Sequence, residues 1–248
     1  MNQKIIHNDL MLLANKEIAE HSQRFFKTGK GEYGESDIFL GIRVPVLRKL
    51  VNKYRGISLE EVSKLLHSKF HEERLLAVLM LVQLFKTGGD EEQKQIYGLY
   101  LENTKFINNW DLVDISAGNI VGAYLYEKDR VPLYRLVKSQ NLWERRISII
   151  STFHFIRNYD FDDTLKIAEI LLNDKEDLIH KAVGWMLREV GKRELEIEEE
   201  FLQEHYQEMP RTMPRYAIER ITEARRKVYL KGQILTQTHI NLKEWLMI

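Results

Sequence analysis

Two tryptophan segments of the chain each set a large aromatic ring beside charged groups. The first is NWDLVD at 109–114, and the second is KAVGWMLRE at 181–189. Trp110 and Asp114 lie four residues apart, so on a helix their side chains project from the same face. An electron-rich indole and a carboxylate in one small site would attract a positively charged substrate or intermediate. Trp185, in the second segment, could offer another such ring.

Each of these side chains also has an ordinary structural use. Taken alone, Trp110 is more often a packing residue and Asp114 a helix cap or an ion-pair partner, at odds of about three to one. Trp185 could equally stack between helical hairpins. We expect Trp143 in the core, and Asp111 in a capping or supporting position. A wider pattern is therefore needed to favour chemistry over packing.

The elements that would carry these residues are helices. Residues 74–85 are apolar nearly all round, as expected of an inner helix, and segments 143–156 and 179–190 are similar. Segments 91–102 and 194–204 show the polar side of outer helices. No strand-like alternation competes with this interpretation. The sequence therefore predicts an all-α protein.

The inner segments recur at the spacing of a helical repeat. Their starts, at 73, 110, 145, 180 and 214, are roughly 35 residues apart, within the range of helical-hairpin repeats. We therefore predict a single-domain α-solenoid, an α-α superhelix of HEAT-like repeats, over residues 1–230. In such a solenoid the first turns of the inner helices line one concave surface. Residues 231–248 form an apolar C-terminal extension, which we expect to pack on the solenoid or on a neighbour.

The distribution of charge suits a row of phosphates. The net charge is zero, but residues 194–204 are acidic and residues 211–231 are basic. Taken alone, such runs are more often solvated helix surfaces, at odds of about two to one. Helix N-termini and cations at the inner first turns would together make one concave, basic DNA-binding groove. These cations are Arg74, Arg145, Arg146, Lys181 and Arg215.

The composition excludes several classes of protein. With 248 residues, of which 44% are hydrophobic, the chain can bury a substantial core. It has no cysteine, which excludes a disulfide framework, a thiolate zinc site and a catalytic thiol. No apolar run approaches membrane-spanning length, and the start lacks the apolar core of a signal peptide. We therefore expect a cytoplasmic protein that does not enter a membrane.

Five short segments extend the pattern across roughly residues 20 to 225. In type and order they resemble the AlkD-like HEAT-repeat DNA alkylation repair glycosylases, which remove alkylated purines. Together they are far more specific than any one of them. The segments are FLGIRVP at 39–45, NWDLVD at 109–114, WERR at 143–146, KAVGWMLRE at 181–189 and MPRYA at 213–217.

This resemblance implies an active site and a substrate. Trp110, Asp114 and Trp185 would be the catalytic residues, and Arg146 would hold a phosphate near the lesion. The protein would be a monofunctional glycosylase, a hydrolase of N-glycosyl bonds that excises cationic N3- or N7-alkylated purines in base excision repair. We expect no cofactor, no metal, a monomer, and double-stranded DNA with alkylated bases as the partner. The DNA-binding residues expected beside Arg146 are Arg43, Lys181, Arg188, Arg211 and Arg215.

The residues suit this chemistry. An alkylated purine is cationic and already a good leaving group, so the enzyme need only stabilise the sugar cation and position a water. Asp114 could do both, through Coulomb attraction in a partly desolvated site and a hydrogen bond to the water. The alternative is a non-catalytic HEAT-like solenoid that binds DNA structure or scaffolds proteins, because a fold alone specifies no chemistry. Asp114 favours the enzyme, since a pure DNA binder needs no carboxylate beside phosphates.

Other features have plainer interpretations. Phe25 or Phe26 could be the aromatic stacker that the family is expected to provide from its first helix. Residues 29–34 match a dinucleotide fingerprint but follow an expected helix instead of a strand, so we interpret them as a loop. His67 and His71 are four residues apart, yet a helix cap between them would put them on different helices, which disfavours a metal site. The preference between N3-methyladenine and N7-methylguanine stays open.

Overall fold

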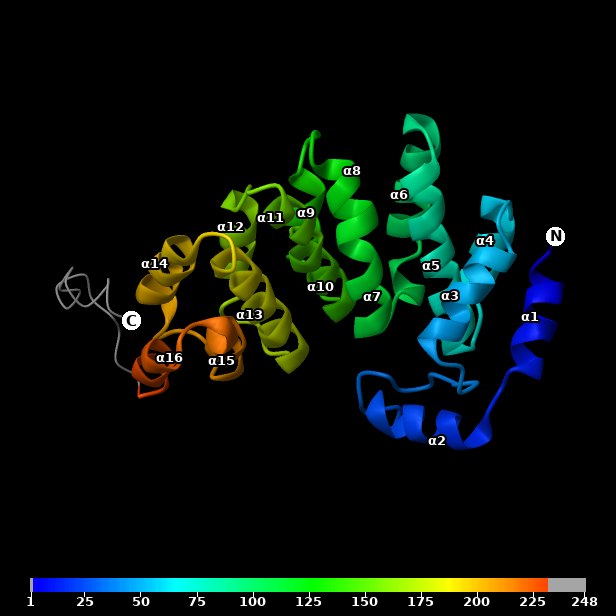
Figure 1. Ribbon diagram of the computed structural model, residues 1–248, viewed down its shortest axis with the longest axis horizontal. Coiled ribbons are helices and arrows are strands. Elements are labelled where there is room, and N and C mark those ends of the chain that lie inside the picture. Colours follow the sequence, from blue (N-terminus) through cyan, green and yellow to red (C-terminus); the bar gives the residue numbers. More distant parts are fainter. Residues whose placement is uncertain (1, 232–248) are drawn as a thin grey trace. The chain divides into compact units, whose positions relative to one another are not determined.

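The computed structural model describes residues 2–231, which fold into two compact units divided after Asp129. We call them unit 1 (residues 2–129) and unit 2 (residues 130–231). Both consist of helices (Figure 1), and the β pairing within residues 2–231 is limited to one isolated bridge between Ile38 and Phe70. The all-α class is confirmed. The single domain over 1–230 and the concave groove stay predictions, and the extension lies, except for Lys231, outside the described residues.

Unit 1 packs its helices around α5. This helix contacts α3, α4, α6 and α7, and its residues 75–81 are all buried. A helix that is apolar on every side needs neighbours on every side, so its sequence pattern is explained. The helices of unit 1 are α1 (Gln3–Leu12), α2 (Lys16–Phe25), α3 (Val44–Lys53), α4 (Leu59–Leu66), α5 (His71–Thr87), α6 (Asp90–Glu102), η1 (Thr104–Phe106), α7 (Trp110–Ala117), η2 (Gly118–Gly122) and α8 (Ala123–Leu125).

The segment before α3 is anchored to the first turn of α5. The carboxylate of Glu72, which is 3% exposed, accepts the backbone N–H groups of residues 40–42 at 2.8, 2.8 and 3.2 Å. Gly41 has φ of +80°, and a Cβ there would lie 2.1 Å from the carbonyl oxygen of Asn15. Only glycine combines this backbone conformation with so close an approach. The FLGIRVP segment therefore fixes the entry to α3.

Unit 2 packs around α13. A Cβ at Gly184 would lie 2.3 Å from the carbonyl oxygen of Met213, so glycine lets α15 lie directly against α13. Figure 1 shows α15 beside α13, with α14 and α16 nearby. The helices of unit 2 are α9 (Val131–Leu136), α10 (Leu142–Ser151), α11 (Phe153–Arg157), α12 (Asp162–Ile170), α13 (Asp177–Gly191), α14 (Leu195–His205), α15 (Thr212–Ala217), η3 (Ile218–Arg220) and α16 (Glu223–Leu230).

The inner helix expected over residues 143–156 is two helices, α10 and α11, which meet at Thr152. The hydroxyls of Ser151 and Thr152 donate to backbone carbonyls of the preceding turn at 2.6 and 2.7 Å. Such bonds compete with the helical ladder and bend helices. Trp143 is 7% exposed, which confirms its expected place in the core.

The acidic helix α14 is less solvated than its charge pattern suggests. Glu198 and Glu199 are 1% and 6% exposed. Burial, reinforced by the charge of Glu199, raises the pKa of Glu198 to about 8 against the opposing charge of Arg188. The interpretation of this run as a plain solvated surface is therefore wrong for these two residues.

Within residues 2–231 the helices are too short or too polar to cross a membrane. The same part of the chain contains no group of three or more His, Asp or Glu side chains arranged to hold a metal ion.

Candidate functional site

The helix α7 begins at Trp110 and carries both Trp110 and Asp114. Asn109 is fully buried and caps this helix, because its Oδ1 accepts the N–H of Trp110 at 2.9 Å. A side-chain acceptor at this position satisfies a donor that the helix itself leaves unpaired. Trp110 and Asp114 are both half-buried, and their spacing puts them on one face of the helix.

Trp110 and three phenylalanine rings form an aromatic cluster, which we define as Phe25, Phe26, Phe39 and Trp110. Phe26 lies nearly parallel to Trp110 and to Phe39, with centroid separations of 5.1 and 5.0 Å. Phe25 meets Trp110 edge-on at 5.9 Å and is 58% exposed. Both candidates for the stacker thus lie beside Trp110, Phe26 inside the stack and Phe25 at its exposed end.

A buried charge network, which we define as Asp37, His71, Arg74, Asn109 and Asp111, adjoins this cluster. His71 lies between two carboxylates, with Nδ1 3.0 Å from Asp37 and Nε2 2.8 Å from Asp111. Arg74 donates to Asp37 at 2.6 Å, and Asn109 donates to it at 3.3 Å. Arg74 is only 4% exposed, so a phosphate would have to compete with Asp37 for this guanidinium. The network joins the segment before α3 to the first turns of α5 and α7.

Electrostatics keep His71 protonated in this network. Burial alone would lower the pKa of His71, but the charge of Asp111 and the hydrogen bonds to Asp111 and Asp37 raise it to about 9. Burial would also raise the pKa of Asp37, yet the hydrogen bond from His71 and the charge of Arg74 hold it below its usual value. At neutral pH His71 is therefore an imidazolium that donates to both carboxylates. Asp111 has the supporting and capping role expected of it, since its other oxygen accepts the N–H of Leu112 at 2.9 Å.

Asp114 lies close enough to Tyr100 of α6 for its charge to act on the Tyr100 hydroxyl. Burial and the charge of Asp114 together raise the pKa of Tyr100, a fully buried residue of α6. The Tyr100 hydroxyl is hydrogen-bonded to Ser116 at 2.7 Å. Coulomb attraction between charges is stronger beside buried protein groups than in bulk water. A cation next to Asp114 would accordingly be stabilised more than at an open surface.

In unit 2, Trp185 is half-buried on α13 and its indole N–H donates to Glu189 at 3.2 Å. Burial would raise the pKa of Glu189, but the hydrogen bond from Lys192 at 2.6 Å helps to hold it below its usual value. The ring of Phe153 lies 5.8 Å from that of Trp185, and the guanidinium of Arg157 lies 4.0 Å above Phe153. The sequence pattern indicated neither Phe153 nor Arg157 as part of this surrounding.

Three arginines of unit 2 that were expected at phosphates contact protein groups. Arg146 is 4% exposed and donates to the carbonyl of Leu178. Arg188 is paired with Glu219. Arg145 donates to Asp174 at 2.6 Å. A phosphate would have to compete with these acceptors.

Residues 6–221 match the profile of a family described as DNA alkylation repair enzyme. The chain belongs to this family. The match spans most of both units and confirms the resemblance carried by the five segments, and it assigns the protein to DNA alkylation repair. No curated protein sequence matches the chain.

Solved structures agree with this DNA alkylation repair family. One is a predicted DNA alkylation repair enzyme from Enterococcus faecalis, with a TM-score of 0.65 and 18% identity over 85% of this chain and 97% of that chain. Another is AlkD2 from Streptococcus mutans, with a TM-score of 0.52 and 17% identity over 83% of this chain and 98% of that chain. At these identities the likeness concerns the fold, and it confirms the expected AlkD-like helical-repeat class.

A groove of about 650 Å³ lies where α13 meets α15. It is lined by two further residues that were expected to contact DNA, Lys181 and Arg215. Lys181 also pairs with Asp177 at 2.8 Å. Arg211 and Arg43 are exposed at the N-terminal ends of α15 and α3. The full lining of the groove is Asp177, Lys181, Thr212, Arg215, Tyr216, Glu219 and Arg226.

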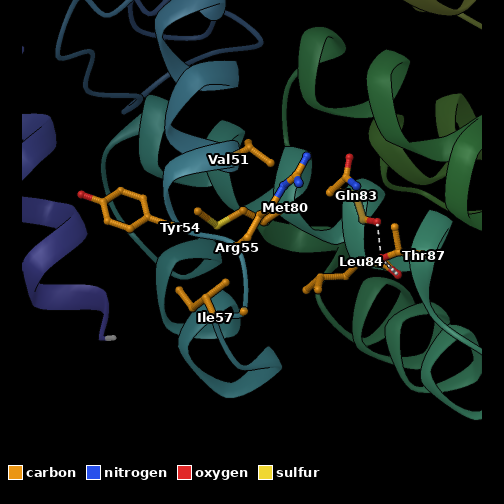
Figure 2. Close-up of a pocket in the computed structure, with 9 residues that line it drawn as sticks. Val51, Tyr54, Arg55, Ile57, Met80, Gln83, Leu84 and Thr87 are labelled. Atoms are coloured by element: carbon orange, nitrogen blue, oxygen red, sulfur yellow. Dashed lines mark hydrogen bonds between the residues drawn. The ribbon is translucent and has the colours of Figure 1, made fainter.

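A separate pocket of about 320 Å³ opens in unit 1 beside α3 and α5 (Figure 2). Figure 2 shows the hydroxyl of Tyr54 pointing away from the other labelled side chains, and this hydroxyl donates to Asp9 of α1. None of the expected site residues lines the pocket, whose described lining includes no carboxylate. It therefore lacks the group that the expected chemistry requires. The lining is Val51, Tyr54, Arg55, Gly56, Ile57, Met80, Gln83, Leu84 and Thr87.

The contacts of His71 were not expected from the sequence. Its spacing from His67 had suggested only a disfavoured metal site, and the structure separates these two residues, since His67 follows the last residue of α4 while His71 begins α5. A histidine that precedes a run of charges at the start of an apolar helix was the available signal. Its partners could not be identified, because Asp37 and Asp111 lie far from it in sequence.

Proposed function

We propose that this protein is a monofunctional DNA glycosylase that releases cationic N3- or N7-alkylated purines from double-stranded DNA without a cofactor. Family membership supports the broader role in DNA alkylation repair. The observation that carries the finer proposal is that α7 holds a half-buried carboxylate, Asp114, and a half-buried indole, Trp110, which is stacked on Phe26 of the aromatic cluster.

The proposed reaction hydrolyses the bond between C1′ of the deoxyribose and the purine nitrogen. The base leaves with the bonding electron pair and becomes neutral, because alkylation had already made it cationic, so no acid is needed. The sugar passes through a cation, to which a water molecule adds its oxygen before releasing a proton. Asp114 would stabilise this cation and orient the water.

The aromatic rings would hold the cationic partner. Trp110 is half-buried beside the exposed Phe25, and Trp185 in unit 2 is half-buried with its N–H fixed by Glu189. Each ring that meets a cation would contribute on the order of 1 kcal/mol or more in a desolvated site. We propose Trp110, Trp185 and Asp114 as the catalytic residues.

Basic side chains of each unit would contact DNA phosphates. Lys181, Arg211 and Arg215 are the proposed contacts of unit 2, and Arg43 is that of unit 1. Arg43 and Arg211 are exposed, and Lys181 and Arg215 line the groove described above, which supports these contacts. Arg146 and Arg188 belong to the same proposal, but they would reach a phosphate only by leaving Leu178 and Glu219.

The test is Asp114→Asn, which removes the charge and keeps the shape. Loss of an electrostatic group of this kind commonly costs a hundredfold or more in rate, so we expect base release to fall by about that factor while DNA affinity is unchanged. The assay incubates the protein with methylated duplex and measures free 3-methyladenine and 7-methylguanine by chromatography. Asp90→Asn, at the exposed start of α6, is the matched control.

Full base release by Asp114→Asn would remove this carboxylate from the mechanism. If the wild-type protein binds the duplex but releases no base, the non-catalytic DNA-binding solenoid becomes the better description.

A further inference from the structure

His71 bridges two chain segments that meet beside Trp110. Its two ring nitrogens contact Asp37, in the segment before α3, and Asp111, in the first turn of α7. The side chain of His71 is 2% exposed, so these contacts form away from solvent. Asp37 also accepts from Arg74 and Asn109, whereas Oδ2 of Asp111 accepts from His71. Because a buried polar group that loses a partner is costly, removal of this ring weakens both carboxylate contacts.

The same network holds both sides of Trp110 in the chain. Asn109 precedes Trp110 and donates to Asp37, while Asp111 follows it and accepts from His71. The rings are also continuous, because His71 is stacked on Phe39 at 4.4 Å and lies 5.2 Å from Phe26, which is stacked on Trp110. A change at His71 is therefore transmitted to Trp110 through the backbone and through the ring stack.

We propose that His71 is a positioning residue, which fixes Trp110 and the first turn of α7 by donating hydrogen bonds to Asp37 and Asp111 at the same time. Its consequence for catalysis rests on the glycosylase function proposed above, since α7 also carries Asp114. A displacement of about 1 Å in a catalytic constellation can cost a hundredfold in rate.

This role requires the charged form of the ring. A neutral imidazole donates from only one nitrogen, so loss of a proton removes the His71 donor from one of the two carboxylates. The charged groups that face His71 are Asp111 of α7, Asp37 before α3 and, through Asp37, Arg74 of α5. The next two acidic side chains of α5 have other partners: Glu72 accepts from residues 40–42, and Glu73 is paired with His7. The raised pKa of His71, about 9, agrees with a ring charged at neutral pH.

The experiment is His71→Gln in protein labelled with fluorotryptophan, read by fluorine NMR. Each tryptophan signal is assigned by its Trp→Phe variant. We expect the Trp110 signal to move while that of Trp143 stays in place. With methylated duplex, we expect the single-turnover rate to fall by about tenfold or more, and the Kd for unmodified duplex to change by less than about threefold. His67→Gln is the matched control, because His67 contacts Asn103 and Phe106 and lies outside the network.

The wild-type protein supplies a second, independent measurement if His71→Gln fails to fold. Its Trp110 signal should shift with pH, with a midpoint near the pKa of His71, about 9, and in step with the His71 ring signals. A Trp110 signal that is the same in His71→Gln and constant with pH would overturn the proposal, as would a slower rate without any change at Trp110. If the wild-type protein releases no base, the proposed function fails, and the Trp110 signal still decides whether His71 positions this ring.

Discussion

Glu198→Gln should remove a large pH dependence from the stability of this protein. Glu198 is 1% exposed, and its Oε1 has no hydrogen-bond partner among residues 2–231. Its carboxyl group occupies the space beside Gly191, where a Cβ would lie 1.6 Å from Oε2 in this side-chain conformation. Burial first, and then the charge of Glu199, raise the pKa of Glu198 from 4.5 to about 8.

The sign and size follow from proton linkage. Between the unfolded pKa of 4.5 and the folded pKa of about 8, the native state holds a proton that the unfolded chain releases. The free energy of unfolding therefore falls as pH rises through this window. At about 1.4 kcal/mol per pH unit, wild-type protein should lose about 3 kcal/mol relative to Glu198→Gln between about pH 5 and about pH 8.

Urea unfolding followed by circular dichroism, at several pH values across this window, measures the difference. Burying the glutamine amide has the same free-energy cost at every pH. The quantity to compare is therefore how the difference in unfolding free energy between wild-type protein and Glu198→Gln changes with pH. Glu200→Gln, at an exposed position of the same helix, should leave the pH profile of the wild-type protein unchanged. A difference between wild-type protein and Glu198→Gln that stays constant across the window would refute the argument, because Glu198 would then be ionised in the native state.

Two further predictions concern packing in unit 2 and binding to DNA. Gly184→Ala should destabilise the protein by about 1 to 3 kcal/mol, because α15 has to move away from the new Cβ, whereas Gly98→Ala, with nothing within 4 Å, should stabilise it by up to about 1 kcal/mol. Thermal unfolding of both variants tests this, and equal melting temperatures would contradict it. Lys181→Ala and Arg215→Ala should each flatten the slope of log affinity against log salt by about 0.9, as measured by fluorescence anisotropy on duplex DNA. Lys166→Ala, on α12, serves as the control, and an unchanged slope in both groove variants would place the DNA on another face.

The periodic features of this protein could be predicted from its sequence, because they depend on neighbours along the chain. The all-round apolar pattern of residues 75–81 is sufficient to indicate an inner helix, and the spacing of Trp110 and Asp114 is sufficient to put them on one face. Ion-pair partners could not be predicted in this way. Arg74 and Arg146 are of a residue type that often binds phosphate, but both are buried against residues distant in sequence. Arg74 donates to Asp37, and Arg146 donates to the carbonyl of Leu178.

The aromatic stacker expected from the first helix also depends on contacts that the sequence pattern does not reveal. The sequence left Phe25 and Phe26 as equal candidates, since adjacent residues of an expected helix end are indistinguishable by period. Packing separates them, because Phe26 is stacked between Trp110 and Phe39 while Phe25 is the exposed ring. Which of these rings meets DNA stays a prediction.

The first turn of α5 makes the folding of unit 1 cooperative. Its residues 71–74 are all buried, and all contact groups that are distant in sequence: His71 contacts Asp37 and Asp111, Glu72 accepts from residues 40–42, Glu73 pairs with His7, and Arg74 donates to Asp37. All four charges are compensated together only when α1, the segment before α3 and the start of α7 are in place. A partly assembled unit therefore carries uncompensated buried charge, which disfavours intermediates. Substitutions within this tetrapeptide should consequently be non-additive, with each loss weakening the contacts that the remaining three make.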